Sequence, residues 1–592
     1  MMKSKFIYLL MMLVGVLACS EDFTESTAYG ALSDDALANA EGVDLLLVGA
    51  YSLLDGHSDT GSSDWEKTAD GWWYDAISDD AHKGSTNGDQ ADLFLIETFD
   101  WNTTNPYFGG KWRALYASVN RCNAVLSLIN KIEEGNFTQQ EAEARFLRAH
   151  YNFELQKGWG NVAFISVENY DNTEFNQPNS GPIWDQIEAD MEFALNNLGD
   201  QSDLGRPNTW TATAYLGKIH LYQGEWNEAL TYLETVINLG PYDLLDEYVD
   251  NFRLAGETGE ESVFAIQYTA DAGVSFNGNR GGTLSFPNGG PIGSCCGFYQ
   301  ASQDLVNAYQ TENGLPLLDT YNQNDVANDY GLNSFQDGIE DANGNPVPTD
   351  FEPEDAPLDP RLDYVVGRRS LDMNGWGVNI GKDWIRASFN DISGPYLTKK
   401  NYYHNGEDAN RGTGGWGEQR SGINYHIIRF ADVLLMGAEA AVETGALDKA
   451  LTWTNMVRMR AKNMTYLKAF ELVSLPNEGG FTSVPVEVNG VHVDAANYEI
   501  ETYQSFPDAT FARKAVRFER RLELGVEGHR LFDLRRWGNA TEVMNEYIQN
   551  EARTIPPFGT AANPYTATYD LFPVPLGAID LSGGVLTQNP GY

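Results

Sequence analysis

The sequence predicts a mostly α-helical protein: a tetratricopeptide-like helical scaffold with a large loop-rich insertion, which we expect to carry the ligand site. Two observations lead to this fold class. Apolar residues recur at helical spacing in several paired stretches. Between these pairs lies a long segment rich in Gly, Asn, Asp, Pro and aromatic residues. The 592 residues are 42% hydrophobic and 21% charged, which is enough apolar surface for a sizeable core.

A short apolar segment begins the chain. Two lysines precede the uncharged run 6–18, which is too short to span a bilayer and is typical of a secretory signal peptide. The run ends in Leu-Ala-Cys, which resembles a bacterial lipobox with Cys19 as the lipidated thiol. A plain signal peptide that happens to contain a cysteine is the alternative. We expect 1–18 to be a lipoprotein signal peptide and Cys19 to anchor the mature chain to a membrane through lipid.

The predicted helices mostly come in pairs joined by short polar turns. In one pair Gly224 lies at the turn, and small residues before it let the two helices approach, as in a tetratricopeptide unit. Gly445 occupies the same place in a later pair. The pairs are far apart in sequence, so they do not form a continuous solenoid. The predicted helices cover residues 112–131, 141–158, 183–198, 210–223, 227–240, 427–444, 448–460 and 511–527.

The insertion between the helical stretches runs from about 252 to 425. Apolar runs at 262–268 and 362–366 are predicted as strands, and the rest as loop. Loops of this length inside an ordered domain are usually functional. We therefore expect a single domain over 19–592, divided into a tetratricopeptide-containing part at 19–250, the insertion at 251–425 and a C-terminal helical part at 426–592.

The formal charge of −45 limits the partners. A surface this negative repels phosphate, so nucleic acid and anionic lipid headgroups are excluded as partners. Cys122 lies in a helical stretch and is expected to be a small buried hydrophobe. Cys295 and Cys296 are adjacent, so they form either a strained vicinal disulfide or two free thiols.

Catalytic motifs are missing from the sequence. It has no HExxH, GxSxG or Walker loop. The carboxylates Asp79 and Asp80 could serve a glycoside hydrolase, which is the enzymatic alternative. The acidic loop 341–352 lacks the glycine of an EF-hand, and a nonstandard structural calcium ion is left open. We expect no catalytic residue, no cofactor and no other metal.

Aromatic residues in the loops favour carbohydrate binding. Rings stack on the apolar C–H faces of sugars, while Asp, Asn and Arg bind the hydroxyl edges. One aromatic cluster lies near the N-terminus and includes Trp72 and Trp101, and another lies in the insertion and includes Trp376 and Tyr396. Core packing is the alternative for any single tryptophan, but loops lie at the surface.

Several segments resemble the SusD/RagB family of outer-membrane nutrient-binding lipoproteins. They occur in the family's order along the chain: RFLRAHYNF at 145–153, RFADVLLMGAEA at 429–440, NMVRMRA at 455–461, FERRLELGVEGHRLFDLRRW at 518–537, LFPVP at 571–575 and QNPGY at 588–592. The resemblance implies a helical scaffold whose Arg and Glu residues clamp the helices. It also implies glycan capture without catalysis, over a SusC-type TonB-dependent transporter.

Four loop segments resemble a branch of the family that handles fructan or β-glucan. They are ISDDAHKG at 77–84, CCGF at 295–298, DPRLDYVVGRR at 359–369 and SGPYLTK at 393–399. In that branch a Cys pair, an Arg, a Tyr, an Asp and a Trp surround the sugar. The implied glycan-binding residues are Asp80, Cys295, Cys296, Arg368 and Tyr396, with Trp72 or Trp101 as the stacking aromatic. Trp376, from the aromatic cluster of the insertion, is a further candidate for that stacking role.

The expected function is that of a cell-surface lipoprotein that captures a polysaccharide or oligosaccharide and delivers it to a SusC-like transporter. The acidic composition suggests a saline habitat, where algal β-1,3-glucan (laminarin) is a common substrate, and fructan is second. A glycoside hydrolase, or a binder of another nutrient such as peptide, is the alternative. The expected location is the outer membrane, facing outwards and held by lipid.

Overall fold

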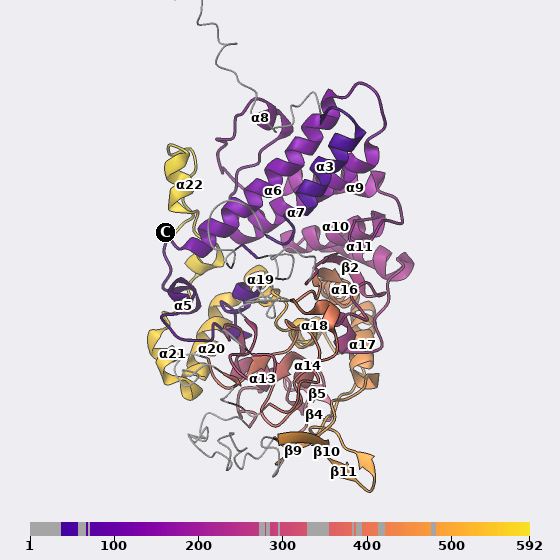
Figure 1. Ribbon diagram of the computed structural model, residues 1–592, viewed down its shortest axis with the longest axis vertical. Coiled ribbons are helices and arrows are strands. Elements are labelled where there is room, and N and C mark those ends of the chain that lie inside the picture. Colours follow the sequence, from indigo (N-terminus) through magenta and orange to yellow (C-terminus); the bar gives the residue numbers. More distant parts are fainter. Residues whose placement is uncertain are drawn as a thin grey trace, which may run out of the picture.

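The computed structural model describes residues 37–56, 65, 67–68, 71–270, 279, 285–293, 297–327, 354–379, 381, 384–385, 393–412, 421–474 and 481–592. Within them the protein is mostly helical, and the strands are short and paired two by two. This confirms the predicted fold class. Figure 1 shows the two longest helices, α6 (Pro106–Lys131) and α7 (Thr138–Trp159), in the upper part of the molecule, and short hairpins near its lower end.

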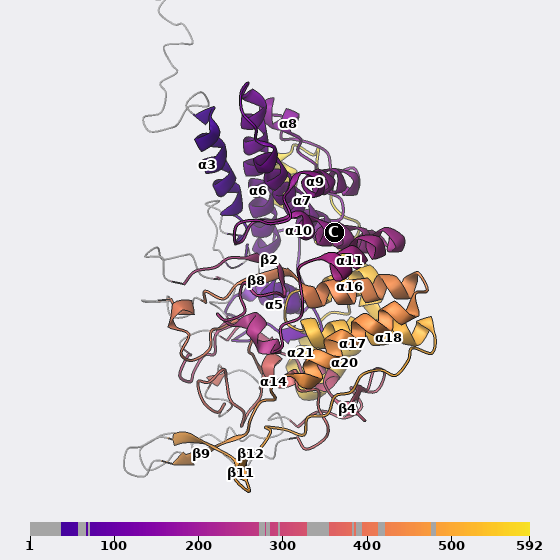
Figure 2. The same ribbon diagram turned by 90° about the vertical axis from the view of Figure 1, so that its right-hand side faces the viewer.

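The helices of the scaffold pack as one series in space, although the insertion separates α11 from α16 in sequence. The helix pairs are thus joined more closely than their separation in sequence predicted. Neighbours along the series pack in the order α3, α6, α7, α9, α10, α11 and α16, and α16 then packs on both α17 and α18. Figure 2 shows α9, α10, α11, α16, α17 and α18 stacked along one side. Their bounds are α3 Ala40–Tyr51, α6 Pro106–Lys131, α7 Thr138–Trp159, α9 Trp184–Asn197, α10 Thr209–Gln223, α11 Trp226–Leu239, α16 Phe430–Glu443, α17 Leu447–Asn463 and α18 Ala509–Leu524.

Close approach between α10 and α11 depends on glycine. A Cβ at Gly217 would lie 2.6 Å from Leu233 Cγ, so only glycine lets this pair of helices meet. Gly224 ends α10 in the left-handed conformation, with φ 75°, and turns the chain into α11. The tetratricopeptide-like turn predicted around Gly224 therefore has the expected local geometry.

Shorter helices complete the molecule. They are α4 Trp72–Asp75, α5 Ala91–Glu97, α8 Val167–Asp171, α13 Gln303–Ala308, α14 Leu362–Val365, α19 Arg530–Trp537, α20 Ala540–Thr554, α21 Pro556–Ala561 and α22 Leu576–Leu581. The described strands all pair antiparallel: β1 Ala81–His82 with β3 Gln300–Ala301, β2 Ser262–Ile266 with β8 Tyr425–Arg429, β4 Thr311–Glu312 with β5 Leu315–Pro316, β6 Val366–Gly367 with β7 Leu397–Thr398, β9 Phe470–Ser474 with β10 Phe481–Pro485, and β11 Glu487–Val488 with β12 Val491–His492.

Two local predictions need correction. Residues 362–366 were predicted as a strand, but Leu362–Val365 is a helical turn and only Val366 begins β6. A short apolar run cannot distinguish a buried turn of helix from a strand. The helix predicted at 427–444 starts at Phe430, because the residues before it form β8 against β2.

A buried ionic cluster joins the C-terminal helices to the rest of the chain. Arg429 contacts Glu261 at 2.8 Å, Glu523 at 2.6 Å and Glu527 at 2.9 Å. All four side chains are almost fully enclosed. Because a buried charge is costly unless paired, this cluster fixes the relative positions of the segments that supply it. The clamping role implied for the Arg and Glu motif residues agrees with this geometry.

Candidate functional site

Strand pairing brings together the described parts of the four loop segments that resemble the fructan/β-glucan branch. β1, which follows Asp80, pairs with β3, and Ser302 donates its backbone N–H to the carbonyl of Asp80 at 3.0 Å. β3 lies against β7, where Thr398 donates its hydroxyl to the carbonyl of Tyr299 at 3.2 Å. β7 pairs with β6, and this register places Arg368 next to Tyr396. Segments more than 300 residues apart in sequence thus meet at one place.

Asp80 belongs to a buried ionic network beneath these strands. Arg521 of α18 donates to Asp80 at 2.8 Å and also contacts Asp304 at 2.9 Å. Arg530 donates to both carboxylate oxygens of Asp79, at 2.8 and 2.7 Å. Both aspartates are fully buried. Asp80 therefore anchors the backbone of its loop to α18, which corrects the prediction that its carboxylate binds sugar hydroxyls.

The same network excludes the hydrolase alternative. Burial acts to raise the pKa of Asp79, but the guanidinium groups of Arg521 and Arg530 hold it at about 2. A carboxyl group with this pKa cannot donate a proton near neutral pH, so Asp79 is excluded as the acid. Burial raises the pKa of Asp80, and for this residue the exclusion depends on its complete enclosure. Since neither Asp79 nor Asp80 is exposed to a substrate, the pair cannot act as the acid and nucleophile of a glycosidase.

Arg368 and Tyr396 are also enclosed. Arg368 binds Asp363 with two hydrogen bonds, at 2.7 and 2.8 Å, and is 5% exposed. The Tyr396 hydroxyl donates to Gln303 Oε1 at 3.2 Å, and this residue is 2% exposed. The prediction that both side chains contact a glycan is corrected: their bonds are made inside the protein, where they hold β6 and β7 in place.

Two tryptophans predicted to stack on the sugar lie in the core. Trp72 is 1% exposed and packs edge-on against Tyr107. Trp101 is 6% exposed, and its indole N–H donates to the hydroxyl of Tyr592 at 2.9 Å. Tyr569 packs edge-on against the same ring. With neighbours around both rings, no face is left for a sugar, and core packing was the correct alternative.

Of the four aromatic residues predicted to bind the glycan, Trp376 is the one that is only half-buried. It lies in a tight loop in which Asn374, Gly375 and Gly377 adopt left-handed backbone conformations. The indole N–H donates to the carbonyl of Tyr403 at 3.1 Å, and the Tyr403 ring packs edge-on at 6.0 Å. These contacts fix the orientation of the indole while leaving part of it at the surface.

Polar side chains bind the backbone of the loop that carries this tryptophan. Asp372 is half-buried and accepts from the backbone N–H of Gly375 at 2.7 Å. Asn405 is exposed and donates its amide to the carbonyl of Gly375 at 2.9 Å. Beneath the loop, Met373 packs against Gly367 of β6, which links Trp376 to the strands that unite the four segments. An aromatic face beside a carboxylate and an amide is the combination that carbohydrate sites use.

Other predicted residues lie outside the described part of the chain. These are Cys19, Cys295, Cys296 and the acidic loop 341–352, so their roles stay predictions. Cys122 is fully buried and free, as predicted. Among the described residues, no helix is long and apolar enough to cross a membrane.

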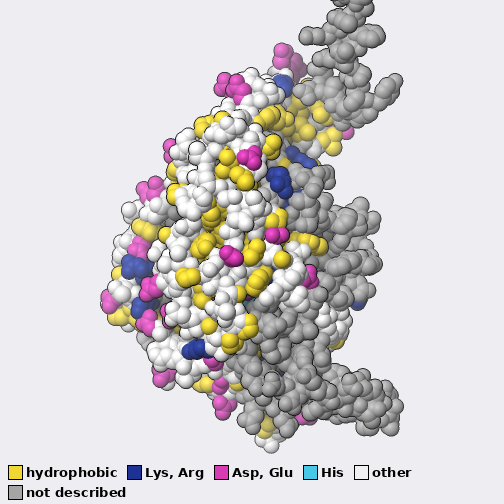
Figure 3. Space-filling model, turned by 90° about the vertical axis from the view of Figure 1, so that its left-hand side faces the viewer, with side chains coloured by type: hydrophobic (Ala, Val, Ile, Leu, Met, Phe, Trp, Pro, Cys, Tyr) yellow, Lys and Arg dark blue, Asp and Glu magenta, His cyan; other side chains and the backbone are white. Residues whose placement is uncertain are grey.

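Two surface grooves lie elsewhere and involve none of the predicted residues. The larger, of about 840 Å³, lies between the start of α6 and α22, and the other, of about 670 Å³, between α3 and β2. Figure 3 shows the side of the molecule where α22 lies, with hydrophobic side chains spread over a surface that has few charges at its centre. Nothing in the sequence motifs points to these grooves.

Family models match most of the chain. The model described as "SusD family" matches residues 260–592, and one described as "Starch-binding associating with outer membrane" matches residues 61–221. The first covers more than half of the chain. A SusD-like protein from Bacteroides ovatus is 28% identical over 189 residues, 29% of this chain and 35% of that protein. The match thus spans about a third of that relative. SusD-like protein P25 of Formosa agariphila is 24% identical over 81% of this chain and 79% of its own length.

Solved structures show the same fold. A SusD superfamily protein from Bacteroides vulgatus has a TM-score of 0.66 at 20% identity, covering 94% of this chain and 99% of its own. Surface glycan-binding protein A from Bacteroides thetaiotaomicron, in complex with laminarihexaose, has a TM-score of 0.61 at 20% identity, covering 93% of this chain and 99% of its own. At this identity the likeness shows the fold alone.

Proposed function

Because the chain belongs to the SusD family, whose members are non-catalytic glycan-binding proteins, we propose that it captures an oligosaccharide or polysaccharide at the cell surface and delivers it to a SusC-like TonB-dependent transporter. The observation that carries the proposal is the meeting of the four branch-like loop segments beside the half-exposed Trp376. Buried ion pairs hold the loop backbones, and the Trp376 side chain is the group proposed to contact the ligand.

The proposed ligand is a β-1,3-glucan such as laminarin, with fructan second. Its support is the laminarihexaose complex of a protein with this fold and the resemblance of the loop segments to the fructan/β-glucan branch. The proposed ring contact is stacking of Trp376 on a sugar face, with Asp372 and Asn405 binding hydroxyl groups. The loss of a stacking tryptophan removes about 2 kcal/mol of binding free energy, or about a 30-fold loss of affinity.

Affinity electrophoresis against laminarin, levan, starch, xylan and mannan tests the ligand. Laminarin should retard the wild-type protein, and Trp376→Ala should abolish most of that retardation without changing the melting temperature. Trp226→Ala is the matched control, because Trp226 is also half-buried but lies at the start of α11. Equal retardation of both variants would place the glycan away from Trp376. Retardation by xylan or mannan alone would exclude laminarin and fructan.

The proposed location and partner have separate tests. We propose that Cys19 carries lipid and holds the protein on the outer membrane, in keeping with the family description that names this membrane. Cys19→Ala should release the protein into the soluble fraction. Purification in mild detergent from cells with an intact operon should recover the transporter with it, and recovery of this protein alone would contradict the partnership.

A further inference from the structure

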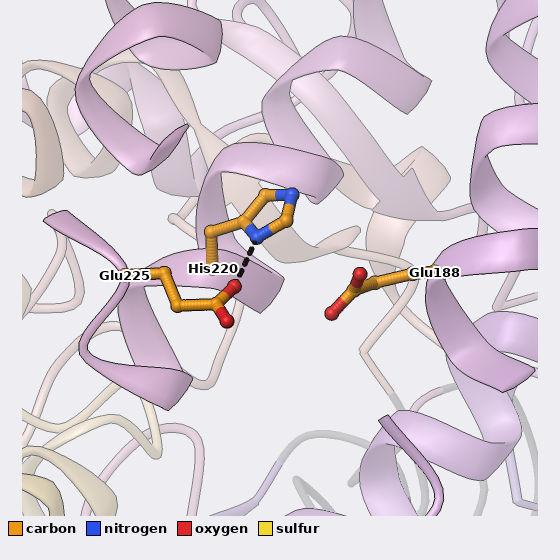
Figure 4. Close-up of side chains that lie close together, drawn as sticks. All are labelled: Glu188, His220 and Glu225. Atoms are coloured by element: carbon orange, nitrogen blue, oxygen red, sulfur yellow. Dashed lines mark hydrogen bonds and ion pairs between the residues drawn. The ribbon is translucent and has the colours of Figure 1, made fainter. Parts of the chain in front are cut away.

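Three side chains of types that bind metals, two glutamates and one histidine, lie close together on the scaffold. They are far in sequence from the loop segments. Glu188 of α9, His220 in the last turn of α10 and Glu225 at the turn into α11 each offer one ligand atom, and these atoms lie within 4.8 Å of one another. Figure 4 shows the imidazole and both carboxylates turned toward the same space. From this arrangement we propose that the three residues form a zinc site that ties α9 to the α10–α11 turn.

Each ligand is held in a suitable orientation. Nδ1 of His220 is 2.7 Å from Glu225 Oε2, and the imidazole stacks parallel to the Tyr232 ring at 5.4 Å. Gln223 donates its amide to Glu188 Oε1 at 2.5 Å. The contacts from Tyr232 and Gln223 come from outside the three proposed ligands, and outer contacts of this kind orient the ligands of metal sites. The bond between His220 and Glu225 joins two proposed ligands, so it must open when the ion binds.

The distances suit zinc after a small movement of the glutamates. Zinc binds imidazole nitrogen and carboxylate oxygen at about 2.0–2.2 Å, so tetrahedral ligand atoms stand about 3.5 Å apart. His220 and Glu225, 2.7 Å apart, must move apart slightly, and the other pairs, which lie within 4.8 Å, must close by at most about 1.3 Å. Glu225 is exposed and Glu188 is half-buried, so both can make this adjustment. Water completes the coordination on the solvent side.

Local charge and ligand chemistry favour this cation. Glu188 and Glu225 each bring a carboxylate oxygen within 4.8 Å of a His220 ring nitrogen, so two negative charges repel each other at this place. A divalent cation lowers this repulsion. An imidazole ligand favours zinc over calcium or magnesium, which prefer all-oxygen sites.

Isothermal titration of the metal-stripped protein with ZnCl₂ tests the site. We expect one zinc ion per chain, and at least about a tenfold loss of affinity in His220→Ala and in Glu225→Gln. Zinc should raise the melting temperature of the wild-type protein and not that of Glu225→Gln. Because Glu225 is exposed, this second variant should fold normally without metal. His492→Ala, which changes a histidine on β12, should bind zinc like the wild type.

Three results with the wild-type protein or His220→Ala would overturn the proposal. They are absence of zinc binding by the wild-type protein, equal affinity in His220→Ala, and displacement of zinc by an equal concentration of Ca²⁺. Loss of binding in His492→Ala would also overturn it, because the zinc would then be held on the β11–β12 hairpin. Glycan binding by Trp376 is independent of all these outcomes.

Discussion

His82 gives the protein a pH-dependent stability of predictable sign and size. It lies on β1 and is fully buried between two carboxylates, with Nδ1 2.8 Å from Glu97 and Nε2 3.0 Å from Glu551. Burial alone would lower the pKa of His82, but the hydrogen bonds and charges of Glu551 and Glu97 raise it from 6.5 to about 9. The protonated imidazole therefore bridges β1, α5 and α20 at neutral pH.

The sign follows from the two protonation states. Below pH 6.5 the imidazole is protonated in both the folded and the unfolded chain, so its full contribution is present. As the pH rises through about 9, the unfolded chain binds fewer protons than the folded one and the contribution is lost. A shift of one pKa unit corresponds to about 1.4 kcal/mol. The rise in the pKa of His82 from 6.5 to about 9 therefore corresponds to about 3 kcal/mol of free energy of unfolding.

Urea unfolding at about pH 6 and about pH 9.5 measures this contribution. The wild-type free energy of unfolding should fall by about 3 kcal/mol more than that of His82→Gln. The comparison of the two proteins is needed because Lys400, whose pKa burial lowers to about 8, titrates in both. His150→Gln is the matched control: this histidine is buried too, but burial lowers its pKa to about 4, below the window. Identical pH dependence in the wild type and His82→Gln would refute the reasoning.

Two further predictions concern packing and ion pairing in the fold. Arg521→Ala should lower the free energy of unfolding by about 3–5 kcal/mol, measured by urea unfolding, because it removes a shared guanidinium from three buried carboxylates. An effect below about 1 kcal/mol would contradict this network. Gly217→Ala should cost about 1–3 kcal/mol through its clash with Leu233, whereas Gly49→Ala in α3 meets no atom within 4 Å and should stabilise by up to about 1 kcal/mol. Thermal melts that rank these two variants in the reverse order would contradict the α10–α11 contact.

Scaffold helices such as α11 and α18 could be predicted from the sequence because they are amphipathic, and periodicity records which face is buried. Helices α3 and α20 were not predicted, although both carry apolar faces against the core. The short helix at 362–365 was assigned to a strand because its apolar run is too short to show a period. Tertiary contacts decided these elements.

The candidate site was predictable only in part. Sequence motifs identified the segments that meet, but not which side chains would be enclosed. Asp80 and Arg521 are 441 residues apart, so their ion pair leaves no local signal. Trp72 follows a glycine in a segment that resembles a surface loop, yet its ring enters the core. The zinc ligands are likewise divided between two separate helices and a turn, and only His220 and Glu225 are near each other in sequence.

In the proposed glycan site, the division between enclosed charges and the half-buried Trp376 separates stability from ligand choice. Arg521, Arg530 and Arg368 bind their carboxylate partners inside the protein, so changing the ligand need not disturb them. Trp376 is held by one hydrogen bond to a backbone carbonyl and by a turn of left-handed residues, neither of which involves the buried ion pairs. Substitutions at the exposed rim of this loop are therefore expected to alter affinity with little effect on folding, because surface changes away from buried contacts usually stay within about 0.5 kcal/mol. Substitutions of the enclosed arginines should instead lower the stability of the fold, with little direct effect on ligand affinity.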